Sequence, residues 1–353
     1  MNSGGDGLKA AHGPDTPVGG QAVVEGVMMR APNATSVAVR KEDGSIVVRI
    51  RSARRIASRI PWLGRPGTRG IAVLLETMSD GISSLNFAAA QSMPESEGGE
   101  KTGASIAIGA TMVIALAFGF FMFAVLPHAL TLGLGALLGD NALESGRAVV
   151  FHLVDGIVKM LIFLAFMWGV SLMKDMRRVF EYHGAEHQAV HAFEAGLELT
   201  NKSLSRFPTA HPRCGTAFLI TVIAVSIIVF AAVFPFMPVL FENRILNQLA
   251  YVLIKAPLVL PIASLSYELI RLASRLDSRW LGWLLSAPGV LFQKITTKQP
   301  DEGQREVAIV ALKTALTPGL AGVGPGKPES VLTFADFNEF TAWVPSPDQG
   351  ASS

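Results

Sequence analysis

Four long apolar segments constrain the fold of this chain more than any other feature of its sequence. Each is close to the roughly 20 residues that a helix needs to cross the hydrocarbon core of a bilayer. They are residues 105–127, 149–173, 216–241 and 249–273. Because backbone polar groups in lipid must be paired within the spanning element, they predict a mainly α polytopic membrane protein with about four transmembrane helices. A shorter apolar stretch, 129–139, is expected at the outer interface or as an extension of the first helix.

Composition excludes several other classes of protein. Half of the 353 residues are hydrophobic and 16% are charged, which is too apolar for an ordinary soluble enzyme. The net charge of +2 implies no basic surface for nucleic acid, so the predicted partner is the lipid bilayer. One cysteine excludes an internal disulfide. Residues 1–18 lack an apolar core and are expected to be disordered, so membrane insertion relies on the internal segments.

Lysine and arginine placement predicts the orientation of the segments. The N-terminal region, the 174–213 connection and the C-terminal region are basic, whereas the other two connections show little beyond Arg147 and Arg244. Because basic loops stay in the cytoplasm, both termini and the 174–215 connection are expected there.

A small β-rich unit precedes the membrane part, over residues 19–91. Residues 19–30 are typical of a strand interrupted by Gly26, and Asp43-Gly44 between two alternating runs predicts a hairpin. An arginine-rich approach then leads into a helix with an apolar stripe between Ile71 and Leu85. Helices of this kind usually bury that stripe in protein; the alternative is a helix lying on anionic lipid. Residues 92–104 form a polar linker.

The C-terminal part contains two weaker patterns. Residues 276–314 include Trp280 and Trp283, which suit a membrane interface, and predict short interfacial helices. Residues 315–353 are rich in Gly, Pro and Ser and are predicted to be a disordered tail.

The stretch Tyr182-His183-Gly184-Ala185-Glu186-His187 carries the strongest chemical signal. On a helix, His183 and His187 lie one turn apart on the same face, with Glu186 beside them. Two imidazoles at this spacing can bind a zinc-type divalent ion, with the carboxylate as ligand or general base, and the order His-x-x-Glu-His is the inverzincin pattern. The alternative is a set of interfacial histidines bonded to lipid phosphate or carbonyls.

The third ligand stays open at this point. Glu194 continues the helical stripe, His211 and Cys214 follow in a loop, and Glu268 lies near the end of the fourth segment. Glu268 can instead form a salt bridge to Arg271 or Arg275. His191 is either a further ligand or a neighbour.

Two further groups admit a functional interpretation. Asp155 and Lys159 are i,i+4 neighbours inside the second segment, with His152 one turn before and Lys255 in the fourth segment. They favour a structural ion pair between helices over a proton or substrate path. Cys214 as a nucleophile is the less favoured interpretation of the loop, because a Cys-His pair must be recognised by geometry.

Several linked motifs resemble the YqhQ-like family, a bacterial membrane family of unknown function whose members are described as predicted metal-dependent enzymes. The motifs are residues 19–30, 69–71, 182–187, 211–216, 266–268 and 300–309. The resemblance extends over residues 18–314. It implies a bacterial inner-membrane protein with a metal at the histidine stretch, and Gln21, Glu25 and Arg30 suggest that the soluble unit folds back onto that site.

The favoured function is a metal-dependent hydrolase at the cytoplasmic membrane surface, acting on a lipid headgroup or a membrane peptide. His183 and His187 would be ligands, Glu186 the base, and Arg213 would hold an anionic group of the substrate. The alternative is a scaffold or membrane-protein biogenesis factor with a closed, structural metal site. Transport is a third possibility, weakened by only four segments without an inverted repeat.

Overall fold

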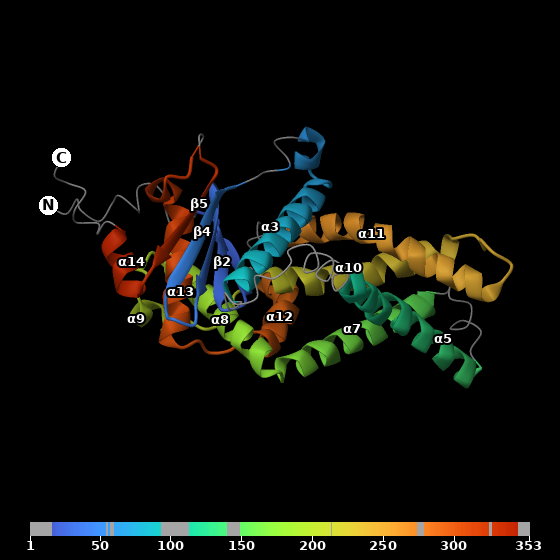
Figure 1. The fold of residues 1–353 in the computed structure, drawn as a ribbon. Helices are drawn as coiled ribbons and strands as arrows, with labels where there is room; N and C mark the ends of the chain where they lie inside the picture. The colour runs from blue at the N-terminus through green and yellow to red at the C-terminus, as the bar shows by residue number, and fades with distance from the viewer. Residues whose placement is uncertain are drawn as a thin grey trace, which may run out of the picture.

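The computed structural model describes residues 16–53, 56, 60–92, 113–139, 149–212, 214–273, 279–324 and 327–344. It contains a five-stranded antiparallel sheet whose strands are neighbours in sequence order. They are β1 (Gly19–Val23), β2 (Gly26–Arg30), β3 (Ala34–Arg40), β4 (Ile46–Ser52) and β5 (Glu329–Phe334). The sheet lies at one end of the molecule, and the long apolar helices extend toward the other (Figure 1).

Tight hairpins connect the first four strands. The predicted turn at Asp43-Gly44 joins β3 to β4, and Gly44 has the positive φ (89°) that such turns require. The first hairpin turns at Val24 and Glu25, because Val23 pairs with Gly26. The interrupted strand predicted over residues 19–30 is therefore two paired strands.

Different helices cover the two faces of the sheet. One face packs on α8 (Lys174–Glu194) and α13 (Glu302–Leu316), which share a core with β2, β3 and β4. The other face packs on α3 (Arg69–Ser92), whose Ala88 lies among Val23, Met28 and Val37. This arrangement places α8, with its histidines, directly against the edge strand β1.

Four helices are long and apolar enough to cross a membrane: Val113–Leu138, Val149–Ser171, Phe218–Phe236 and Arg244–Leu272. They comprise η3 (Phe121–Val125), α5 (Leu126–Leu138), α7 (Val149–Ser171), α10 (Gly215–Val233), η4 (Phe234–Phe236) and α11 (Arg244–Ala273). The 129–139 stretch continues the first of these helices, and residues 105–112 of the predicted segment lie outside the described residues. At most 39% of each apolar window is buried, so most of this apolar surface faces outward.

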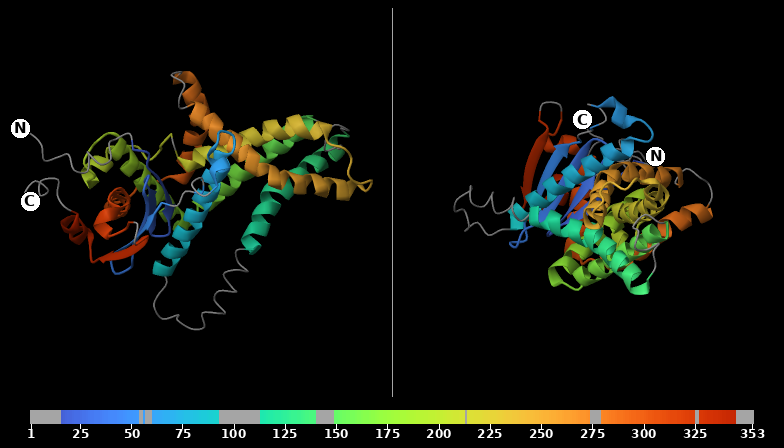
Figure 2. Two further views of the ribbon diagram at one scale, coloured as in Figure 1. Left: turned by 90° about the horizontal axis from the view of Figure 1, so that it is seen from above. Right: turned by 90° about the vertical axis from the view of Figure 1, so that its right-hand side faces the viewer.

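Helix α3 links the sheet to α11, and both neighbours lie alongside it in Figure 2. Its N-terminal turn is so close to α11 that a Cβ on Gly70 would lie 2.6 Å from the Ser264 Cα. The Ser264 hydroxyl also donates to the Gly67 carbonyl at 2.7 Å. α3 buries its small residues here, whereas Leu75 and Met78 of the apolar stripe are 42% and 53% exposed. The expected burial of that stripe in protein is therefore wrong.

The two helices predicted as interfacial, within residues 276–314, differ in their surroundings. α12 (Arg279–Thr296) packs on α7 and α10, where Phe292 contacts Phe163 and Ile220. α13 instead lies in the soluble core, with Val307 and Leu312 fully buried. Both helices have an apolar side, and the sequence pattern is the same whether lipid or protein covers that side.

The predicted disordered tail is ordered in part. After η5 (Pro318–Ala321), β5 adds to the free edge of β4, with Ile46 opposite Phe334 and Arg51 opposite Glu329. α14 (Phe337–Trp343) then packs Phe340 into the core. Composition alone did not predict β5, because its pairing partner, β4, lies near the other end of the chain. The short helix α9 (Asn201–Leu204) and η1 (Pro61–Gly64) complete the described elements.

Candidate metal centre

Helix α8 carries His183, Glu186 and His187 at the predicted spacing. Their exposed fractions are 8%, 4% and 1%, so all three side chains lie in the interior rather than at a lipid or water surface. The helix ends at Glu194, and Gly196 follows in the left-handed conformation (φ 67°) that commonly terminates helices.

Both imidazoles are oriented by backbone carbonyls. His183 Nδ1 lies 2.8 Å from the Thr296 carbonyl oxygen, and His187 Nδ1 lies 2.5 Å from the Thr209 carbonyl oxygen. A carbonyl can only accept, so Nδ1 carries the proton in each ring and Nε2 carries the lone pair. Metal-binding histidines are typically held in this way, with one nitrogen donating to the protein and the other free for the ion.

Cys214 completes a group of three possible ligands. Its Sγ lies 3.3 Å from His183 Nε2, and it caps the N-terminus of α10 by accepting from the Thr216 N–H at 3.4 Å. One ligand atom from each of His183, His187 and Cys214 falls within 4.8 Å of the others. Tetrahedral zinc with bonds of about 2.0–2.3 Å requires ligand separations of roughly 3.5 Å, so a small contraction would suffice.

Glu186 is the fourth polar group at this point. Its Oε2 lies 3.5 Å from His187 Nε2 and 3.9 Å from His183 Nε2, and the Gly20 N–H donates to the carboxylate. Burial raises the pKa of Glu186 to about 8, and burial with the neighbouring His183 lowers the pKa of His187 to about 2. Among the described residues, His187 Nε2 has no hydrogen-bond partner. A cation between these groups would remove both penalties.

Residues 207–212 and Cys214 of one loop close over the histidine side of α8. Besides the Thr209 carbonyl and Cys214, it offers the Phe207 carbonyl to Gln188 Nε2 at 2.9 Å. It also offers the Ala210 carbonyl to His191 Nε2 at 2.9 Å. The loop thus contacts successive turns of α8, which explains why histidines and cysteine separated in sequence converge.

Two glycines allow the close packing behind the site. A Cβ on Gly184 would lie 2.0 Å from the carbonyl oxygen of Lys298, which follows the end of α12. Only glycine therefore allows this segment to pack on α8, where the Thr296 carbonyl meets His183. A Cβ on Gly20 would lie 2.9 Å from Glu186 Cγ. Each glycine lies in one of the sequence motifs, Gly20 within residues 19–30 and Gly184 within residues 182–187, but their packing role is visible only in three dimensions.

Glu194 and His211, two candidate ligands, belong to a separate group. His211 Nε2 lies 3.3 Å from Glu194 Oε2, and both lie with His191 in a second set whose ligand atoms fall within 4.8 Å of one another. The structure therefore does not place them with His183 and His187 as third ligands.

Glu268 lies elsewhere, against Arg69. Arg69 donates to it through Nε at 2.7 Å and also through Nη2, and the Gly67 N–H donates at 3.1 Å. The structure therefore does not bring Glu268 to His183 and His187, because Glu268 is hydrogen-bonded to Arg69 of α3. Of its two alternative partners, Arg271 also interacts electrostatically with the Glu268 carboxylate, and Arg275 lies outside the described residues. Arg213, the predicted substrate-binding residue, lies outside the described residues.

Of the three motif residues expected to bring the N-terminal unit to the site, Glu25 contacts α8, whereas Gln21 and Arg30 face α3. Arg178 of α8 donates to the Glu25 carboxylate through Nε and Nη2, the latter at 2.7 Å, and the Tyr182 hydroxyl lies 3.3 Å from it. The first hairpin is therefore attached to the same helix that carries the histidines.

Comparison with known proteins identifies the family. The family model described as "protein of unknown function (DUF1385)" matches residues 65–318, which is most of the chain. The chain belongs to the DUF1385 family. It is also 29% identical over 313 residues to the protein named "uncharacterized protein YqhQ" of Bacillus subtilis (strain 168). That match covers 84% of this chain and 92% of the relative. No solved structure matches the chain.

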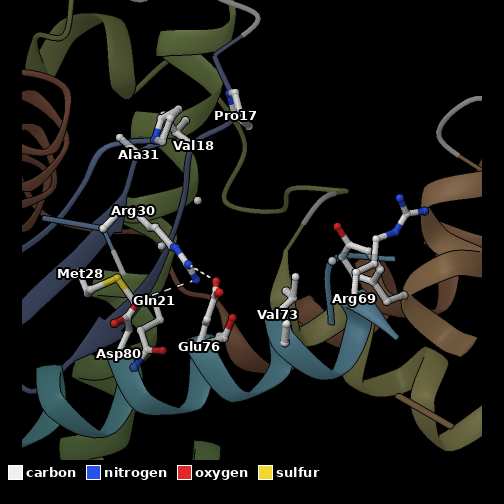
Figure 3. Close-up of a pocket in the computed structure, with 18 of the residues that line it drawn as sticks. Pro17, Val18, Gln21, Met28, Arg30, Ala31, Arg69, Val73, Glu76 and Asp80 are labelled. Atoms are coloured by element: carbon white, nitrogen blue, oxygen red, sulfur yellow. Dashed lines mark hydrogen bonds and ion pairs between the residues drawn. The ribbon is translucent and has the colours of Figure 1, made fainter. Parts of the chain in front are cut away.

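A cavity of about 680 Å³ lies on the other side of β1 in this DUF1385 member. Its walls come from the start of β1, the end of β2 and one side of α3, with Tyr267 of α11 at its margin. Figure 3 shows Arg30 pointing across it to Glu76 and Asp80, which it meets at 2.6 and 3.7 Å. Gly20 lines the cavity and also donates to Glu186, so the cavity and the metal centre share one strand.

The charged residues within the apolar helices form a separate cluster in this family member. Lys255 Nζ lies 2.9 Å from Asp155 Oδ2, closer than Lys159 at 3.8 Å, and 3.4 Å from His128 Nδ1. The ammonium also lies within 6 Å of three phenylalanine ring centroids, those of Phe151, Phe230 and Phe234. Three helices, α5, α7 and α11, are thereby joined, as expected for a structural ion pair.

Proposed function

We propose that this protein is a membrane-embedded, metal-dependent hydrolase, with His183, His187 and Cys214 as zinc ligands and Glu186 as general base. The observation that supports it best is the convergence of two buried imidazole lone pairs, a thiol and a carboxylate. Each ring is held by a carbonyl oxygen, so the arrangement exists before any ion binds.

The donor set favours a particular metal and role. Imidazole and thiolate are the ligands that zinc prefers, and three protein ligands are typical of catalytic sites. When bound there, the ion would acidify a water molecule. Glu186, beside both Nε2 atoms, would accept the proton, and the Gly20 N–H would hold the carboxylate in place. Arg213 remains the candidate for holding an anionic group of the substrate.

The membrane assignment rests on the four apolar helices and on the exposed stripe of α3. The helices have the length and composition of spans, and Leu75, Met78, Ile82 and Leu85 of α3 are each at least 40% exposed. α8 directly follows α7 and begins with the basic residues Lys174, Arg177 and Arg178. The site would thus lie at the cytoplasmic surface of the bacterial inner membrane, with both termini on that side.

This placement limits the substrate to a class. A centre at the inner membrane surface is reached most readily by a lipid headgroup or by the juxtamembrane part of a membrane peptide. The cavity beside β1 provides both apolar walls and charged groups for such a ligand.

The first experiment measures zinc per chain by elemental analysis of detergent-purified protein. The wild type should contain zinc, His183→Ala and His187→Ala should each bind one zinc ion fewer per chain than the wild type, and Glu186→Gln should bind as many as the wild type. Glu268→Gln is the matched control: it changes a carboxylate that the sequence also offered as a ligand, and it should keep the ion because Glu268 pairs with Arg69.

Activity is then compared on phospholipid vesicles and on membrane-embedded peptides. Glu186→Gln should reduce turnover at least about 100-fold with the ion retained, as loss of a general base does. Loss of zinc in Glu186→Gln would make Glu186 a fourth ligand of a closed structural site and overturn the hydrolase assignment. A wild type without bound metal would overturn the metal centre as well.

A further inference from the structure

A second group of metal-capable side chains lies one to two turns further along α8. His191 and Glu194 come from the helix and His211 comes from the closing loop. One ligand atom from each residue lies within 4.8 Å of the others, as in the group of His183, His187 and Cys214. Two imidazoles and a carboxylate within this distance form a common set of ligands for divalent metals.

The position of His211 is fixed by its own backbone. The Gln293 side chain of α12 accepts from the His211 N–H at 2.7 Å and donates to the His211 carbonyl at 2.9 Å. His211 and Gln293 are 4% and 0% exposed. The backbone of His211 is therefore fixed by two hydrogen bonds to one side-chain amide, and its imidazole lies in the interior.

His191 is oriented in the same manner as the first two histidines. Its Nε2 faces the Ala210 carbonyl oxygen at 2.9 Å, so that nitrogen carries the proton and Nδ1 carries the lone pair. Its ring also stacks on Phe207, with 5.7 Å between centroids and 8° between planes. A ring held at both its edge and its face is arranged before a ligand arrives.

Local charge also favours a cation here. Glu194 is the last residue of a 21-residue helix, and the C-terminal end of a helix carries a partial negative charge. The Glu194 carboxylate adds to that charge, 3.3 Å from His211 Nε2. This group contains no thiol, so its ligands are harder than those of the first group.

We propose that His191, Glu194 and His211 bind a second divalent transition-metal ion beside the first. The two groups are neighbours, because the His187 and His211 rings are 5.8 Å apart between centroids. They are nevertheless separate sets, since Cys214 belongs to one and His211 to the other. This second site does not depend on the hydrolase activity proposed above.

The test counts metal per chain after saturation with zinc and removal of the excess. Two ions are expected in the wild type and one in either Glu194→Gln or His191→Ala. Cys214→Ala and His183→Ala should also leave one ion, the one in the second group. Glu198→Gln is the matched control, because it removes an exposed carboxylate just beyond the same helix and should leave two ions.

Cobalt substitution shows which site is filled, without any activity assay. A sulfur-to-cobalt charge-transfer band should persist in Glu194→Gln and disappear in Cys214→Ala. Cys214→Ala should keep the ligand-field bands of cobalt bound by nitrogen and oxygen at the second site. Glu194→Gln retains the shape of the side chain, so correct folding is expected and is checked by the surviving first ion.

Other stoichiometries overturn the proposal in distinguishable ways. One ion that is lost only in the His183 and Cys214 variants would leave the proposed hydrolase centre intact and reduce His211 and Glu194 to a hydrogen-bonded pair. One ion lost in both sets of variants would mean a single shared site. No ion in the wild type would remove the second site and the proposed function together.

Discussion

At the scale of single residues, Glu186 has the most costly environment in the described part of the site. Its carboxyl is 4% exposed, and burial raises its pKa to about 8. His187 beside it resists protonation, because burial lowers its pKa to about 2. A cation bound beside the neutral His187 ring would allow the buried Glu186 carboxyl to ionise.

Removal of the metal should therefore make the stability of the protein depend on pH through Glu186. Its folded pKa of about 8 exceeds the ordinary 4.5, so its contribution is complete below pH 4.5 and is lost as pH rises through about 8. The loss amounts to at most about 1.4 kcal/mol per pH unit. The apparent melting temperature of chelated protein in detergent should fall between pH 6.5 and 8.

Glu186→Gln serves as the control for that measurement, because glutamine does not titrate. The chelated variant should show a flatter profile over the same interval, and added zinc should flatten the wild-type profile. The opposite contribution of His187, lost as pH falls below about 6.5, is common to both proteins. Parallel profiles for the two chelated proteins would show that Glu186 is not the titrating group.

The sequence predicted which side chains could act, but not which of them meet. His183, Glu186 and His187 follow from helical periodicity alone, because they share one turn. The carbonyls of Thr209 and Thr296 could not be predicted, since backbone acceptors carry no residue-type signal. The sequence also offered Glu268 as a ligand, because its partner Arg69 lies on α3, far away in the sequence, and residue spacing does not reveal that contact.

At the scale of elements, the antiparallel sheet combines local and distant strands. The hairpin of β3 and β4 was predictable because Asp43-Gly44 joins adjacent runs. β5 was not, because six residues with little alternation become a strand only when the edge of β4 is available. Likewise, the apolar side of α13 gave no indication that it would cover the sheet rather than face lipid.

The ordered tail should therefore be needed for stability. Phe340 of α14 is fully buried against Phe334, with ring centroids 5.3 Å apart. Phe340→Ala should destabilise the protein by about 3–5 kcal/mol through the cavity it leaves. Val331→Ala, at a position of β5 that is 54% exposed, is the control and should change stability by no more than about 0.5 kcal/mol. Thermal melting in detergent compares the two, and equal melting temperatures would indicate that this tail does not pack as described.

At the scale of the whole molecule, the sheet and the apolar helices are joined through α3, α8 and α12. α8 continues from α7, α12 returns from α11, and α3 lies against α11 at Gly70. Because β4 and β5 share one sheet, the chain between them must cross the proposed membrane an even number of times. Four apolar helices meet that requirement, and this argument is independent of the distribution of lysine and arginine.

A side chain at Gly70 should separate α3 from α11. A Cβ there would lie 2.6 Å from the Ser264 Cα and 2.9 Å from the Tyr267 Cβ, so one helix must move. Gly70→Val should increase hydrogen exchange of the backbone amides around residues 67–72 and 264–268 at least about tenfold, equivalent to about 1.4 kcal/mol of local opening. Gly169→Val, at a position with no atom within 4 Å of a Cβ, is the control. Unchanged exchange in Gly70→Val would mean that the two helices do not touch there.

The position of β5 has a consequence for biosynthesis. Ribosomes deliver β1 to β4 first, then all four apolar helices, and only afterwards α12, α13 and β5. During that interval the edge of β4 has no partner, and His183 and His211 lack Thr296 and Gln293. A nascent chain thus completes its five-stranded sheet and organises its histidines in the same late step, so an interrupted translation product would leave both unfinished and exposed to proteases.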